Sequence, residues 1–246
     1  MNAIEIKELH KSFGNKEAVK GLSLNIGHHE LFGLLGVNGA GKTTTIRMIC
    51  CLLKPTSGEI LVEGKSVNES PTTIKKLINL SPQETTIAEG LTVKENLMLM
   101  AGLYGLKPKR AAENVERIIK DFNLEEIAGD KAKTLSGGWQ RRLSIAMALV
   151  TEPEILFLDE PTLGLDVIAR RELWETIKEL KAKMTIVLTT HYLEEAEALC
   201  DRIAVMSKGK LMALGTAEEL KAQAGCDNFE DAFVKLAGGK ECEQNV

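Results

Sequence analysis

The sequence predicts an α/β fold built on a mostly parallel sheet, and three observations favour it. Short aliphatic and β-branched runs alternate with segments of helical period along most of the 246 residues. An apolar strand, a glycine-rich loop and a helix follow one another directly between residues 31 and 53. With 44% hydrophobic and 27% charged residues, the chain can bury a sizeable core as one large domain.

The expected elements follow in chain order. The first part of the chain predicts a helix at 42–53 and strands at 3–9, 22–26, 31–35 and 59–62. Residues 84–150 show helical patterns alone, at 94–103, 110–122 and 137–149, which predicts an inserted helical subdomain. Strands at 154–158, 185–189 and 203–206 then alternate with helices at 167–182 and 192–200. We therefore expect a main domain over 1–225 and a short helical tail over 226–246, with its helix at 229–236.

Charge, cysteine content and hydropathy exclude several classes of protein. The net charge is −4, from 31 Lys and Arg against 35 Asp and Glu, so we expect no nucleic-acid partner. Five cysteines, two of them adjacent at Cys50 and Cys51, favour reduced thiols in a cytosolic compartment. The apolar runs fall far short of the ~20 residues that a membrane-spanning helix needs, and residues 1–11 contain no signal-peptide core. We expect a chain that does not cross a bilayer by itself.

The clearest motif is a glycine-rich string at 36–43, which matches the phosphate-loop pattern G-x-x-x-x-G-K-[ST] between its expected strand and helix. The glycines let backbone N–H groups wrap phosphates, Lys42 would reach the β- and γ-phosphates of ATP, and the Thr43 hydroxyl would bind Mg²⁺. The candidate nucleotide-binding residues here are Gly36, Val37, Asn38, Gly39, Ala40, Gly41, Lys42, Thr43 and Thr44. A chance glycine-rich turn is a weak alternative, at roughly one match per hundred chains of this length.

Two carboxylates end the predicted strand at 154–158. Asp159 is expected to hold Mg²⁺ through a water molecule, and Glu160, one residue further on, to polarise an attacking water. Ligands of parallel sheets bind at the carboxyl ends of the strands, where both residues would lie. On its own, an apolar strand ending in Asp-Glu is more often a strand that meets solvent. Together with the phosphate loop, it favours ATP hydrolysis.

A second anion-binding helix start is predicted at Leu135-Ser136-Gly137-Gly138-Trp139-Gln140. One nucleotide cannot be wrapped by two such loops of the same chain, so this string should contact the nucleotide of a partner. In isolation it could also be an ordinary capped helix start. The string resembles the LSGGQ signature of ABC ATPases, and the resemblance extends from Phe13 to about Gly225.

The resemblance implies roles for further residues. Gln83 looks like the Q-loop glutamine that touches Mg²⁺ and senses a membrane partner, and His191 like the switch histidine that contacts the γ-phosphate. Phe13 matches the aromatic residue that stacks on adenine, and residues 163–166 resemble the D-loop. The signature residues implied at the nucleotide of the partner are Ser136, Gly137, Gly138 and Gln140. The implied fold is that of a P-loop NTPase, with a RecA-like sheet, an N-terminal antiparallel β part and a helical subdomain inserted at about 84–150.

Residues 32–36, 54–58 and 193–197 are similar to bacterial exporter ATPases of the drug-resistance and sodium-efflux type. The interval between Lys42 and Ser136 leaves room for a short helical subdomain and not for the long coiled coils of DNA-repair relatives. Two positions in the motifs differ from the family. Val37 replaces the usual Pro of the phosphate loop, and Leu163 replaces the usual Ser of the D-loop.

The resemblance therefore implies an ATP-hydrolysing subunit that powers a membrane exporter. Two copies, or one copy and a homologous subunit, would close on two Mg·ATP while an integral membrane permease holds them at the cytoplasmic face of the cell membrane. Residues 91–101 could supply a groove wall for that permease, although most of them are expected to be subdomain core. A soluble ABC-type ATPase of a cytosolic assembly process would share every catalytic motif and stays an alternative. A non-enzymatic regulatory module would lack Asp159, Glu160 and His191, and a P-loop kinase would have no use for the signature string.

Overall fold

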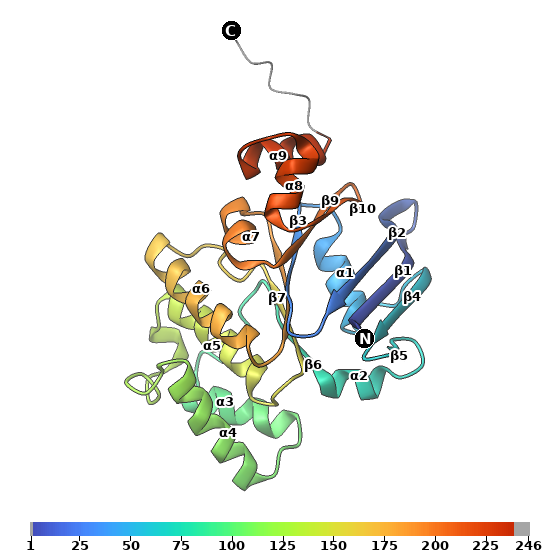
Figure 1. Cartoon of the computed structure of the whole chain (residues 1–246). Coiled ribbons are helices and arrows are strands. Elements are labelled where there is room, and N and C mark those ends of the chain that lie inside the picture. The colour runs from blue at the N-terminus through green and yellow to red at the C-terminus, as the bar shows by residue number, and fades with distance from the viewer. Residues whose placement is uncertain (1, 239–246) are drawn as a thin grey trace.

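In the computed structural model, which describes residues 2–238, the chain forms two sheets with helices between and around them (Figure 1). The larger sheet has six strands in the order β10-β9-β3-β8-β7-β6. Their bounds are Leu31–Leu35 for β3, Ile78–Ser81 for β6, Ile155–Asp159 for β7, Thr185–Thr190 for β8, Arg202–Ser207 for β9 and Lys210–Gly215 for β10. Neighbouring strands from β6 to β9 are parallel, and β10 pairs antiparallel with β9. The predicted α/β fold with a mostly parallel sheet is confirmed.

The smaller sheet is antiparallel and has the order β2-β1-β4-β5. Its strands are β1 (Asn2–Phe13), β2 (Lys16–Gly27), β4 (Ser57–Val62) and β5 (Lys65–Ser66). Helix α1 (Lys42–Ile49) lies between the two sheets in Figure 1, and its Ile46, Met48 and Ile49 belong to the core that both sheets share. The glycine-rich loop that precedes α1 is therefore placed at the junction of the sheets.

Helices α5 (Gly137–Leu149) and α6 (Val167–Lys181) cover the opposite face of the larger sheet, on the left of Figure 1. Alternation along the strands explains the two faces: Leu156 and Leu158 of β7 point into this core, whereas Ile155 and Phe157 point toward α1. Helices α3 (Val93–Leu103) and α4 (Pro108–Asp121) pack against α5 and form the helical block at the lower left. A short 3-10 turn, Ala132–Thr134, precedes the signature string.

The last helices of the described residues pack near the β10-β9 end of the larger sheet. Helix α7 (Leu193–Leu199) is followed by α8 (Ala217–Ala224) and α9 (Phe229–Leu236), which share a small core with Ile203 and Val205 of β9. The helix expected at 229–236 is confirmed, and residues 239–246 of the expected tail lie outside the described residues.

The sequence patterns predict neither the strands β5, β6 and β10 nor the helices α2 (Pro71–Leu77) and α8. Two of the four residues of β6 are polar, which hides a strand from a search for apolar runs. Their side chains are nonetheless satisfied, because Asn79 Nδ2 donates to the Ala148 carbonyl at 2.7 Å and Ser81 Oγ lies 3.1 Å from Ser144 Oγ. In α2 only Ile74 is buried, so the helix has no apolar stripe to detect.

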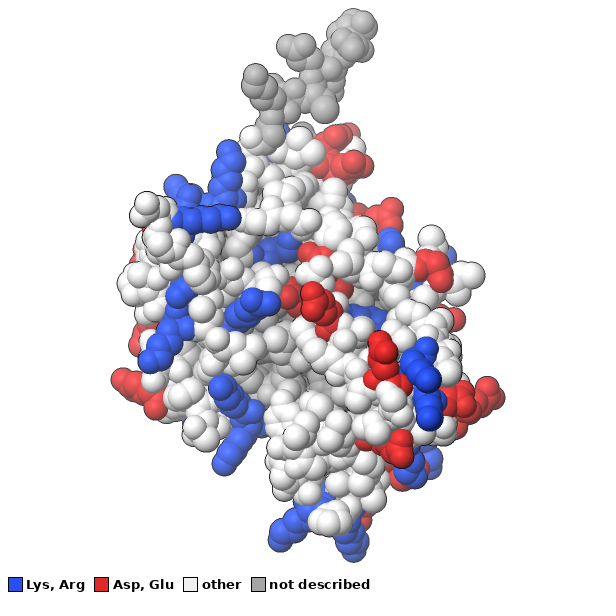
Figure 2. Space-filling view, turned by 180° about the vertical axis from the view of Figure 1, so that it is seen from behind, with Lys and Arg blue, Asp and Glu red and all other residues white. Residues whose placement is uncertain are grey.

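The hydropathy of the helices and the charge of the surface bear on the expected partners. Among residues 2–238, no helix combines the length and the apolar character that crossing a membrane would require. On the face shown in Figure 2, side chains of both signs occur, and neither sign forms a continuous field of the kind that a phosphate-backbone binder presents.

Candidate functional site

Four parallel strands end at one edge of the larger sheet, and a candidate site residue follows or ends each of them. Strand β3 continues into the glycine-rich loop at Gly36, and β7 ends at Asp159. His191 comes directly after β8, and Gln83 follows β6 by two residues. The carboxyl ends of the strands thus bring together residues that are far apart in the sequence.

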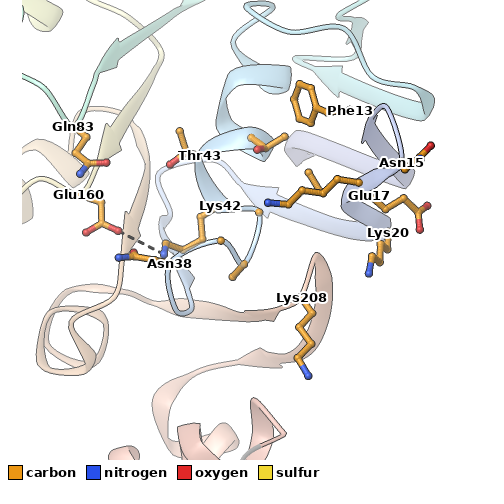
Figure 3. A pocket seen from close by; sticks show the side chains of 16 residues that line it. Phe13, Asn15, Glu17, Lys20, Asn38, Lys42, Thr43, Gln83, Glu160 and Lys208 are labelled. Atoms are coloured by element: carbon orange, nitrogen blue, oxygen red, sulfur yellow. Dashed lines mark ion pairs between the residues drawn. The ribbon is translucent and has the colours of Figure 1, made fainter.

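Between this edge and the antiparallel sheet lies a cleft of about 810 Å³, a size typical of small-molecule sites. In Figure 3, Gln83 and Glu160 lie at one end of the cleft, Lys42 and Thr43 in the middle, and Phe13 toward the other end. Of the site residues expected from the sequence, those that line the cleft are Phe13, Asn38, Gly39, Ala40, Gly41, Lys42, Thr43, Thr44, Gln83 and Glu160. The Phe13 ring is half exposed, so a flat group can stack on it.

Six further residues line the cleft that the sequence did not single out. They are Asn15, Lys16, Glu17, Ala18, Lys20 and Lys208. No motif marks them. They lie in β2, in the turn between β1 and β2, and in the turn between β9 and β10. That turn is fastened to the site by its backbone: Gly209 N donates to the Ala40 carbonyl at 3.1 Å, and the Gly209 carbonyl accepts from Lys20 N at 2.8 Å.

The glycine-rich loop has a backbone that only glycine fits at Gly41. This residue caps α1 with a φ of 104°, and a Cβ there would lie 2.7 Å from the Ala18 carbonyl oxygen. Val37, by contrast, has an exposed side chain and contributes its carbonyl to the loop, so the departure from Pro leaves the loop geometry intact.

The Lys42 ammonium is buried over the loop. Its Nζ donates to the Gly36 carbonyl at 2.6 Å and to the Val37 carbonyl at 3.4 Å, and lies 3.5 Å from Glu160 Oε1. Burial lowers the pKa of Lys42, while the charges of Glu160 and Asp159 act in the opposite direction. A cation in this position can contact a phosphate group that enters the loop.

Oxygen atoms gather around Asp159. Its Oδ1 accepts from Thr43 Oγ1 at 3.1 Å and from Thr189 Oγ1 at 2.5 Å, and Gln83 lies across the cleft from Thr43 in Figure 3. Carboxylate, hydroxyl and amide oxygens are the ligands that Mg²⁺ prefers, so this donor set fits the ion expected from the sequence.

Glu160 is buried with a strained backbone. Its φ is 51°, which a residue with a side chain rarely adopts. Its N–H is held by Thr189, to the carbonyl at 3.1 Å and to Oγ1 at 3.0 Å. The carboxylate lies between Lys42 and His191, whose Nδ1 contacts Glu160 Oε2. The two candidate catalytic residues are therefore in direct contact beside the phosphate loop.

The signature residues lie outside this cleft. Ser136 caps α5, with its Oγ accepting from Trp139 N, and a Cβ placed on Gly137 would meet no atom of the chain within 4 Å. Ser136 and Gly138 instead line a separate small hollow against α6. Gln140 turns into the helical block, where its amide donates to the Ala132 carbonyl at 3.1 Å. One chain thus presents the phosphate loop and the signature string on separate surfaces.

A buried carboxyl behind the site predicts a pH dependence of stability. Glu195 is fully buried, and burial raises its pKa above the usual value of a glutamate even though the hydrogen bond that Trp174 Nε1 donates to Glu195 Oε1 opposes the shift. The folded state then binds a proton more tightly than the unfolded state, so this group stabilises the protein below about pH 4.5 and loses that contribution as the pH rises through the folded pKa. Glu195→Gln keeps an acceptor for Trp174 Nε1 and removes the titration.

We therefore expect the free energy of unfolding of Glu195→Gln, relative to wild type, to increase as the pH rises from about 5 to about 8. Urea unfolding at both pH values checks this. Glu197→Gln, on the exposed face of the same helix, is the control. If the two variants shift in parallel with pH, Glu195 does not titrate as described.

Comparisons with known proteins agree with the geometry. A family model described as ABC transporter matches residues 19–163. The chain is 42% identical over 239 residues to the probable multidrug ABC transporter ATP-binding protein YbhF of Escherichia coli K12, covering 95% of this chain and 41% of YbhF. It is 44% identical over 224 residues to the daunorubicin/doxorubicin resistance ATP-binding protein DrrA of Streptomyces peucetius, covering 91% of this chain and 68% of DrrA.

A solved structure is also similar. The ATP-binding cassette MJ0796, in a dimeric post-hydrolysis state bound to ADP and Pi, superimposes with a TM-score of 0.77 at 28% identity. The match covers 87% of this chain and 98% of that one.

Proposed function

Since the chain belongs to the ABC transporter family as an ATP-binding subunit, we propose that it hydrolyses ATP as one half of a dimer and thereby powers a membrane exporter. The observation that carries the proposal is the separation of two nucleotide-binding surfaces on one chain. The cleft offers a phosphate loop without a signature string, and the signature string lines a separate hollow outside that cleft. A second copy, or a homologous subunit, that turns its signature string toward the cleft would complete the site.

In the proposed reaction the residues of this chain have distinct tasks. The loop N–H groups and Lys42 bind the β- and γ-phosphates of ATP. Glu160 accepts a proton from the attacking water, and His191 positions the Glu160 carboxylate relative to the terminal phosphate. Thr43, Asp159 and Gln83 would hold Mg²⁺, which neutralises phosphate charge when it is bound. Ser136, Gly137 and Gly138 of the partner would close on the same phosphates.

The relatives support export as the process that is powered. The names of YbhF and DrrA refer to multidrug transport and to daunorubicin and doxorubicin resistance. We propose the same class of role here, for a substrate that the permease selects. The chain spans 41% of the length of YbhF.

A groove beside Gln83 is the proposed contact with the permease. It measures about 620 Å³ and is lined by Leu52, Pro82 and Tyr104 together with the basic Arg47 and Lys75. Leu52 is 60% and Tyr104 is 46% exposed, and Pro82 adjoins Gln83. An apolar segment of the permease that carries an acidic side chain would fit these residues. Of the expected stretch 91–101, Val93, Leu97 and Ala101 are buried, and Leu99 is exposed.

This placement predicts that Leu52→Arg releases the protein from membranes. In cells that contain the permease, we expect the wild-type chain to sediment with the membrane fraction and the variant to move to the supernatant. Met212→Arg makes the same kind of change at another exposed apolar side chain, which lies outside the groove, and this variant should stay with the membranes. Phosphate release by both purified variants should remain within about twofold of wild type, because neither residue touches the cleft.

Retention of Leu52→Arg in the membrane fraction would contradict the groove as the contact. A wild-type chain that hydrolyses ATP and never sediments with membranes would instead favour the soluble assembly ATPase.

A further inference from the structure

The side chain of Arg141, in the second turn of α5, is buried and bound to main-chain oxygens. Arg141 is 3% exposed. Its Nε donates to the Pro161 carbonyl at 2.8 Å and its Nη2 to the Asp159 carbonyl at 2.8 Å. Its Nη1 donates to the carbonyls of Pro82 and Gln83. No side-chain acceptor is needed to satisfy this guanidinium.

The four carbonyls belong to two segments that carry site residues. Pro82 and Gln83 form the segment that leads from β6 into the cleft, and Asp159 and Pro161 flank Glu160. Arg141 itself lies four residues after Gly137, on the helix that the signature string opens. One side chain therefore connects the signature helix to both segments on the hydrolytic side of the cleft.

Only an arginine fits this arrangement. A buried cation is costly unless it is paired and fully hydrogen-bonded, and the planar fork of Arg can reach two segments at once. Burial lowers the pKa of Arg141 to about 10, and the charges of Asp159, Glu195 and Glu160 oppose that shift, so the group stays protonated at neutral pH. Arg142 differs: its guanidinium lies over the Trp139 ring at 4.7 Å and donates to Glu172 at 3.1 Å, on the side of the helix that faces α6.

We propose that Arg141 is a positioning residue for hydrolysis, which fixes Gln83 and Glu160 relative to the signature helix of the same chain. The left-handed backbone of Glu160 is held on one side by Thr189 and on the other by the bonds of Arg141 to the flanking carbonyls. A displacement of α5 would thus be transmitted to both segments. This proposal rests on the proposed ATPase function.

The test is Arg141→Lys, in which the shorter side chain and single ammonium group cannot span both segments. We expect ATP affinity, measured by calorimetry, to stay within about twofold of wild type, because Lys42 and the loop are unchanged. We expect kcat to fall at least about tenfold, because small misplacements of reacting groups are costly. Amide hydrogen exchange at Gln83, Glu84, Glu160 and Thr162 should accelerate by about tenfold, while the amides of α4 keep their wild-type rates.

Arg117→Lys is the matched control, since it makes the same change at an exposed residue of the helical block that pairs with Glu152. It should leave kcat and exchange unchanged. Arg141→Met, which keeps the length of the side chain and removes every donor, should lower kcat further.

The proposal is overturned if Arg141→Lys retains the kcat of Arg117→Lys, or if affinity falls in the same proportion as kcat. It is also overturned if exchange accelerates throughout the chain, because that result means a general loss of folding. A wild-type chain that released no phosphate would defeat the proposed function alone. The exchange measurement needs no turnover and would still decide whether Arg141 fixes the two segments.

Discussion

Lys42→Ala is expected to weaken ATP binding roughly 30- to 150-fold, the equivalent of about 2–3 kcal/mol for a lost charge-assisted hydrogen bond. The ammonium is buried over the loop and makes contacts with the Gly36 carbonyl and with Glu160, which a bound phosphate would replace or share. Removing it also leaves the Glu160 carboxylate without its nearest cation. Calorimetric titration with ATP measures the change.

The control for this substitution is Lys65→Ala, which removes the same charge from an exposed position of β5 outside the cleft. Its ATP affinity should equal that of wild type. Unchanged affinity in Lys42→Ala as well would show that the glycine-rich loop does not bind the phosphates.

Glu160→Gln is expected to lower ATP turnover by about 10²- to 10⁴-fold, the usual contribution of a general base. The amide keeps the shape of the side chain and cannot accept the proton of water, so ATP should bind and remain intact. We expect the variant to accumulate as an ATP-bound dimer. Phosphate release and size-exclusion chromatography with ATP measure the two effects.

Glu152→Gln provides a matched control, because Glu152 also has a positive φ, of 55°, and its carboxylate pairs with surface arginines. Its turnover should be that of wild type. Hydrolysis by Glu160→Gln at the wild-type rate would rule out Glu160 as the base.

The parallel sheet could be predicted from the sequence where its strands contain a buried aliphatic or β-branched run. Every residue of β3, β7 and β8 is buried, and each strand contains such a run. Strand β6 escaped detection because Asn79 and Ser81 fill half of it, and only the tertiary fold supplies their partners on α5 and the residues after it. Local pattern therefore predicts the strands in which aliphatic and β-branched residues form a continuous run.

The candidate site divides in the same way. Candidate site residues that belong to a motif, such as Lys42, Asp159 and Glu160, could be predicted from the sequence because the proposed chemistry depends on their residue types and spacing. Arg141 could not, since the carbonyl oxygens that it binds exist at every position and leave no mark in the sequence. Gln140, chosen with the signature, has its amide bonded to Ala132 within the helical block.

The most direct test of a site shared between two chains is a mixing experiment with two variants that are inactive for different reasons. Lys42→Ala disables the phosphate loop. Gly137→Asp adds a negative charge to the signature at a position where an added Cβ meets no atom within 4 Å beyond its own helix turn, and we expect the fold and the cleft to stay intact.

We predict that neither variant alone releases phosphate and that an equal mixture does. Random pairing of the two variants makes about half of the dimers mixed. In a mixed dimer one of the two sites has an intact loop that faces an intact signature, so about a quarter of all sites are intact. Hydrolysis by Gly137→Asp alone, or a mixture as inactive as its components, would contradict a composite site and place catalysis within a single chain.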